Sequence, residues 1–174
     1  MGITGQIIAE AAAMGPRYAK RLISGIPEHR FARMSEPSGK LITANHPAFI
    51  LGHLSLYPTK VLELLEQDTD PAAVPNKYDE LFSKTATCQD DANGSIYPKR
   101  AELIENFERT YEAAIAALPL ATDEFLAVAN PVESPLQQVC TTLGSLLNFY
   151  MNGHVMSHMG QLSTWRRMEG LDAA

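Results

Sequence analysis

The chain has 174 residues, of which 45% are hydrophobic and 20% charged, and this length is enough for one domain with a buried core. The net charge is −6, and the 14 basic residues form no stripe with interleaved aromatics, which argues against nucleic-acid binding. No apolar run approaches the length of about 18 residues that a membrane span needs, and the first residues do not resemble a secretion signal. Cys88 and Cys140 are expected to be free thiols. We therefore expect a single cytoplasmic domain over residues 1–174 that spans no membrane.

Proline residues divide the first two predicted helices. Apolar residues recur at helical spacing over residues 3–26, but Gly15-Pro16 interrupts the pattern. Because proline removes a backbone hydrogen bond, we expect a kink or a restart at that point. The second predicted helix opens near Asn45-His46-Pro47, with Asn45 as its N-cap, and Pro58 should kink it.

Residues 68–97 form a long connection with little periodicity, apart from a predicted short helix over residues 77–83. A connection of this length in a compact domain is often functional, for example as a lid or a pocket wall. Its Asp-rich part is similar to a calcium loop, but Gln89 and Arg100 stand where the pattern requires acidic ligands. We interpret that part as a turn.

Two further helices complete the predicted fold. The third begins at Pro98, and residues 119–134 connect it to the fourth, which is predicted over residues 135–168 and ends at Gly170. Four amphipathic helices without a strand pattern of comparable length predict an all-α fold. The expected architecture is a four-helix bundle with a long irregular connection between helices 2 and 3.

Three histidines occupy positions in the predicted helices where core residues are expected. His154 and His158 lie four residues apart and therefore share a helix face, and His53 lies in the apolar stripe of the second helix. If the stripes face one core, the three imidazoles converge and suit a divalent zinc, nickel, copper or iron ion. The alternative is that core hydrogen bonds or water satisfy these histidines. His46 lies about 10.5 Å along the helix from His53, so we expect it to start the helix or line a pocket mouth.

Two other side chains lie about one helical turn from the paired histidines. Gln161 and Tyr150 are candidates to orient a ligand or a water molecule from behind the metal ligands, although Tyr150 is equally well explained as a core aromatic. Cys140 is expected to be a core thiol because it is distant along the helix from His154. Neither a Glu-xx-His pattern nor a His-Glu pair is present, which argues against a di-iron site and against a zincin protease.

Two sequence blocks together resemble the DinB-like family over nearly the whole chain. They are Asn45-His-Pro-Ala-Phe-Ile-Leu-Gly-His53-Leu, and His154-xxx-His158-xx-Gln161-Leu followed by Trp165-Arg-Arg-Met-Glu-Gly. That family has a four-helix bundle with a three-histidine metal site, usually reported with zinc or nickel. The resemblance implies that His53, His154 and His158 bind one divalent ion, most commonly zinc or nickel.

The resemblance also implies a function. Characterised relatives include bacillithiol S-transferases and mycothiol-dependent maleylpyruvate isomerases, which activate a low-molecular-weight thiol at the metal. The expected activity is therefore transfer of a low-molecular-weight thiol to an electrophilic small molecule. The alternatives are a hydrolase that uses metal-bound water, and a non-catalytic metal-binding or stress-associated protein. The sequence indicates no catalytic group beyond the metal-bound water or thiolate.

A homodimer is expected for two reasons. Homodimers are common in the family that the chain resembles. In addition, the fourth predicted helix carries apolar residues outside its main stripe, so a second face needs covering. These residues are Met151, Val155, Met156 and Met159.

Overall fold

The structure, a computed structural model, describes residues 2–173, and every regular element in that range is helical. The prediction of an all-α fold is therefore confirmed. Two isolated β-bridges, Ser35–Ile42 and Ala129–Thr142, only join loop segments. The α-helices are α1 (Ile3–Ala12), α2 (Met14–Ile23), α3 (Pro47–Leu54), α4 (Tyr57–Leu64), α5 (Lys77–Phe82), α6 (Arg100–Ala117), α7 (Asp123–Leu126), α8 (Leu143–Asn148) and α9 (His154–Met168).

Both predicted proline interruptions are present. The helix is interrupted at Ala13, between α1 and α2, and Pro16 lies in the first turn of α2. Pro58 likewise lies in the first turn of α4, after the break that ends α3. The N-cap of α3 differs from the prediction: it is His46, because its Nδ1 accepts a hydrogen bond from the backbone N–H of Phe49 at 3.1 Å.

The prediction of one helix from Pro135 to Met168 is wrong in its first part. Residues Pro135–Gln138 form a 3-10 turn, and Val139 is 81% exposed. The α-helix starts at α8 because Thr142 and Ser145 form a capping box, in which each side chain accepts from the backbone N–H of the other. A π-helical turn, Phe149–Gly153, then separates α8 from α9, and such turns rotate the face that the following helix presents.

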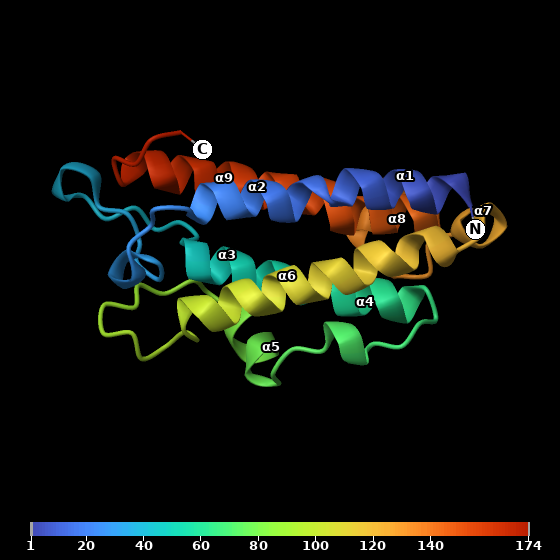
Figure 1. Ribbon diagram of the computed structural model, residues 1–174, viewed down its shortest axis with the longest axis horizontal. Coiled ribbons are helices and arrows are strands. Elements are labelled where there is room, and N and C mark those ends of the chain that lie inside the picture. The colour runs from blue at the N-terminus through green and yellow to red at the C-terminus, as the bar shows by residue number, and fades with distance from the viewer. Residues whose placement is uncertain (1, 174) are drawn as a thin grey trace.

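The helices pack along their lengths around one buried apolar cluster. In Figure 1, α2 and α9 run side by side, and α6 runs across α3 and α4, in agreement with their contacts. The packing sets α3 against α9 as well, so that His53 and the paired histidines face the same region. No helix within residues 2–173 has the length and apolar character to cross a membrane.

The long connection between α4 and α6 is attached to the helical core. Its short helix α5 is confirmed, and Tyr78 of that helix is buried with its hydroxyl accepting from Asn106 at 2.9 Å. The Arg109 guanidinium donates to the carbonyl groups of Pro71 and Ala73. These contacts hold the connection as a fixed wall beside α3 and α6. Further along, the Asp91 carboxylate accepts three backbone N–H groups from Ser95, Ile96 and Tyr97, which is the predicted turn.

The apolar residues of α9 outside the main stripe are covered by the chain itself. Met151, Val155 and Met159 are fully buried, and only Met156 is substantially exposed, at 43%. This face therefore gives no support to the predicted homodimer, which remains a prediction.

We predict that Gly52→Ala destabilises the fold. A Cβ atom at this position in α3 would lie 2.5 Å from the ring of Phe82, which is fully buried and cannot move without opening the core. Overpacking of this kind costs about 1–3 kcal/mol of the free energy of unfolding. Urea denaturation measures the loss.

The matched control for Gly52→Ala is Gly160→Ala in α9, where an added Cβ meets no heavy atom within 4 Å. Alanine favours a helix over glycine by about 1 kcal/mol, so this variant should be as stable as the wild type or more stable. Equal stability of the two variants would contradict the packing argument.

Candidate metal centre

Three histidine side chains converge between α3 and α9. His53 comes from the last turn of α3, and His154 and His158 come from the first turns of α9. His154 Nε2 lies 3.3 Å from His53 Nε2 and 3.0 Å from His158 Nε2. All three ligand atoms lie within 4.8 Å of one another, and no acidic or cysteine side chain joins this group within residues 2–173.

These separations fit one metal ion. Zinc–imidazole bonds are about 2.0–2.1 Å long, so two nitrogens in a tetrahedral site stand about 3.3 Å apart, and in an octahedral site about 2.9 Å. The distances from His154 Nε2 to the other two Nε2 atoms, 3.0 and 3.3 Å, lie within this interval. Three neutral nitrogen donors also suit zinc or nickel, and the set leaves further coordination positions for other ligands.

Hydrogen bonds on the far side of the ring fix two of the imidazoles. His53 Nδ1 lies 2.6 Å from the carbonyl oxygen of Phe82, and His158 Nδ1 lies 3.0 Å from Gln161 Oε1. Both oxygens are acceptors, so each Nδ1 carries the proton and each Nε2 presents its lone pair to the centre of the site. This is the tautomer that a metal ligand needs.

His154 is held differently. Its Nδ1 is buried and has no hydrogen-bond partner in the described part of the chain. Its ring is instead packed between aromatic rings, with centroid distances of 4.3 Å to Tyr57 and 5.8 Å to Phe149. Packing rather than hydrogen bonding therefore orients this imidazole.

All three histidines are neutral near pH 7. Burial lowers the pKa of His154 to about 3, with smaller contributions from the charges of His158 and His53. Burial and the charge of His53 lower the pKa of His158 to about 4. The pKa of His53 is lowered, first by burial and to a lesser extent by Lys60. The lone pairs are therefore available to a cation without competition from protons.

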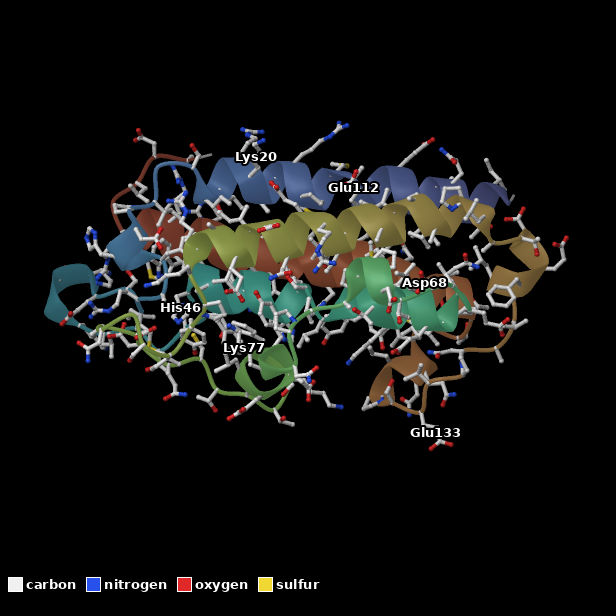
Figure 2. All side chains as sticks on the ribbon, turned by 60° about the horizontal axis from the view of Figure 1, so that its bottom comes forward. Lys20, His46, Asp68, Lys77, Glu112 and Glu133 are labelled. Carbon is white, nitrogen blue, oxygen red and sulfur yellow. The ribbon has the colours of Figure 1, made fainter. Side chains whose placement is uncertain are left out.

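A cavity of about 710 Å³ opens onto this site, and His53 and His154 form part of its wall. Residues 79–85 of the long connection line it, which agrees with the expected role of that connection as a pocket wall. Glu133, on the outer edge of the molecule (Figure 2), contributes to the rim. The charged side chains that line the cavity are Lys60, Glu63, Asp79, Lys84 and Glu133.

The remaining predicted residues have clear positions. Gln161 contacts His158, whereas Tyr150 lies in the cavity wall, where its ring packs against Tyr57. His46 is the N-cap of α3, is fully buried, and is not part of the metal group. Cys140 is a buried free thiol in the loop before α8.

Sequence reasoning missed two parts of the cavity wall. Tyr57 and Lys60 follow His53 at helical spacing, but neither is among the site residues that the sequence predicts. Residues 132–136 were assigned to a connector and a helix start, although they also line the cavity. The spacing of four residues between His53 and Tyr57 could have indicated this, because residues four apart in a helix lie on the same face.

No family model and no curated protein matches this chain.

We predict that His46→Asn flattens the dependence of stability on pH. Burial lowers the pKa of His46 to about 4, from an ordinary value of 6.5. The unfolded chain then binds a proton that the folded chain excludes, so stability falls as the pH drops from about 6.5 to about 4. One group with this shift accounts for about 3 kcal/mol over that range.

Asparagine at this position still accepts from the N–H of Phe49 as an N-cap but does not titrate. Denaturant unfolding of both proteins between about pH 6.5 and about pH 4.5 should show about 2 kcal/mol less loss in the variant. Near pH 7 the variant should be slightly less stable, because the 2.9 Å contact of His46 Nε2 with the carbonyl of Gln89 is lost. Parallel pH curves for the two proteins would contradict the assignment.

Proposed function

We propose that this protein is a metal-dependent enzyme with a DinB-like four-helix bundle, which transfers a low-molecular-weight thiol to an electrophilic small molecule. The observation that carries the proposal is the convergence of three Nε2 atoms, at 3.0 and 3.3 Å, beside a cavity of about 710 Å³. Pairs of helices that continue one another, such as α1 with α2 and α3 with α4, support the bundle.

In this proposal His53, His154 and His158 hold one zinc or nickel ion. A divalent ion at this site lowers the pKa of a coordinated thiol far below its free value of about 8.5. The chain contributes the neutral imidazoles, whose lowered pKa values keep the lone pairs free at pH 7. The hydrogen bonds from His53 to Phe82 and from His158 to Gln161 keep the two rings in place.

The cavity suits a polar small molecule. Its volume lies within the range of about 300–1,000 Å³ that is usual for small-molecule sites. Aromatic rings of Tyr57 and Tyr150 and several aliphatic side chains form part of the wall, and lysine and carboxylate side chains supply charged groups. In the proposed reaction with a haloalkane, the thiol sulfur forms a bond to carbon, the halide departs with the electron pair of the carbon–halogen bond, and the thiol proton passes to water. With an epoxide the ring oxygen takes that electron pair and stays on the product. With maleylpyruvate the sulfur adds to the carbon–carbon double bond, whose electron pair takes up a proton from water.

We predict one divalent metal ion per chain, lost in His154→Ala. This variant removes the nitrogen that is closest to both other ligands. Protein purified without an affinity tag should contain about one equivalent of metal by elemental analysis, and the variant should contain almost none. Added zinc should also raise the unfolding temperature of the wild type, since a ligand at about 100 times its Kd stabilises by about 2.7 kcal/mol.

The matched control for His154→Ala is His29→Ala, which removes an exposed histidine outside the metal group. It should retain the wild-type metal content. Equal metal content in His154→Ala and the wild type would refute the metal site.

We also predict that thiols bind at the open positions of the metal. Cobalt-substituted protein should develop a thiolate-to-metal charge-transfer band when a small thiol is added near pH 7, because metal coordination removes the thiol proton. The band should be absent in His158→Ala. Turnover is then measured by pairing low-molecular-weight thiols with epoxides, haloalkanes or maleylpyruvate.

A normal cobalt spectrum that no thiol perturbs would rule out thiol transfer. The site would then be assigned to metal-dependent hydrolysis if ester or amide substrates turn over, and to a non-catalytic role if they do not.

A further inference from the structure

We infer that Asn45 is a positioning residue for the metal site, which acts through Gln161 to hold His158 in its metal-binding tautomer. The inference rests on the proposed metal site and assigns a role to a residue that touches none of the three imidazoles directly. The side-chain amides of Asn45 and Gln161, which are joined by a hydrogen bond, form what we call the amide relay.

The relay is defined by two hydrogen bonds to one oxygen atom. Asn45 Nδ2 donates to Gln161 Oε1 at 3.2 Å, and His158 Nδ1 donates to the same oxygen at 3.0 Å. An amide oxygen has two lone pairs, so it accepts both bonds. In this arrangement the proton of His158 stays on Nδ1, and Nε2 faces His154 with its lone pair free.

The opposite orientation of Gln161 would have the opposite effect. If the amide turned over, Gln161 Nε2 would face His158 Nδ1 as a donor. The imidazole would then have to accept at Nδ1 and carry its proton on Nε2, which is the atom that a metal requires. As long as Asn45 keeps its Nδ2 toward Gln161, it opposes this rotation, because two amide donors would then face each other.

The contacts of the two neighbouring residues hold the backbone of Asn45 in place. The following residue, His46, is fully buried, accepts from the N–H of Phe49, and contacts the carbonyl of Gln89 at 2.9 Å. The carbonyl of the preceding residue, Ala44, accepts from the thiol of Cys88. Gln161 itself is exposed, so the second bond from Asn45 is what restricts its long side chain.

The relay also lies apart from the substrate cavity. Asn45 and Gln161 line a separate hollow of about 490 Å³ together with Thr164 and Trp165, whereas the cavity wall contains His53 and His154 but not His158. Substitutions in the relay therefore alter the support of His158 without changing the cavity that would hold a substrate.

The experiment measures zinc affinity, by competition with a chelator, and the tautomer of His158 in metal-free protein, by ¹⁵N NMR of the ring nitrogens. Asn45→Asp replaces the donor by an acceptor of the same size, and Gln161→Leu removes the relay. Both should bind zinc about 10–100-fold more weakly than the wild type, which is the usual effect of losing such a support. Asn45→Asp should also shift the His158 proton from Nδ1 to Nε2.

Gln161→Glu should rescue the site, because a carboxylate has no donor end to present to His158. The double variant Asn45→Ala with Gln161→Glu should therefore bind zinc within a few-fold of Gln161→Glu alone, whereas Asn45→Ala in the wild-type background should weaken binding. Thr164→Ala is the matched control, since Thr164 lines the same hollow and donates only to the carbonyl of Gly160. All variants are compared below their unfolding temperatures.

Unchanged zinc affinity and an unchanged His158 tautomer in Asn45→Asp would overturn the inference. If the wild type binds no zinc, the proposed function fails, and the tautomer comparison in metal-free protein still decides the role of Asn45. If Asn45→Asp lowers the unfolding temperature but changes neither the zinc affinity nor the His158 tautomer, Asn45 contributes only to stability. That result would also overturn the inference.

Discussion

The closeness of three imidazole Nε2 atoms is the constraint on which the candidate site depends. Two of the Nε2 atoms, from His53 and His158, carry lone pairs because their Nδ1 atoms donate to fixed oxygens. Both lie within 3.3 Å of Nε2 of His154, which has at most one proton to share between them. Buried acceptors that face each other without a donor are costly, and protonation is opposed by burial. A cation bound among the three Nε2 atoms would satisfy all three lone pairs together.

Interruptions of the helices place these side chains and open the space beside them. His53 lies just before the break that ends α3, and His154 is the first residue after the π-helical turn that ends at Gly153. The first break lets α4 start at Tyr57, whose ring packs 4.3 Å from the ring of His154. The same irregularities therefore create both the ligand geometry and the cavity.

The sequence was most informative where residue spacing alone determines geometry. The pair His154 and His158, the all-helical fold and the proline breaks were predictable, because helical periodicity and the missing proline N–H act locally. The start of α8 at Thr142 was missed, since its apolar pattern continues through the loop before it and a Thr–Ser capping box is a weak signal. The π-helical turn, the contact of Phe82 with His53 and the role of Asn45 depend on residues distant in the chain, and no local pattern shows them.

The support of the three histidines is unequal, and it differs even between the two that line the cavity, His53 and His154. His158, which the cavity does not reach, is held from the opposite side by the amide relay. His53 is held by a backbone carbonyl, the most rigid acceptor that a fold offers. His154 lines the cavity, and its Nδ1 has no hydrogen-bond partner within residues 2–173, so outside the histidine group the rings of Tyr57 and Phe149 pack against it instead. A molecule that enters the cavity and displaces Tyr57 therefore acts first on His154. Within the described residues, the candidate ligand with no hydrogen bond at Nδ1 is also the most exposed of the three.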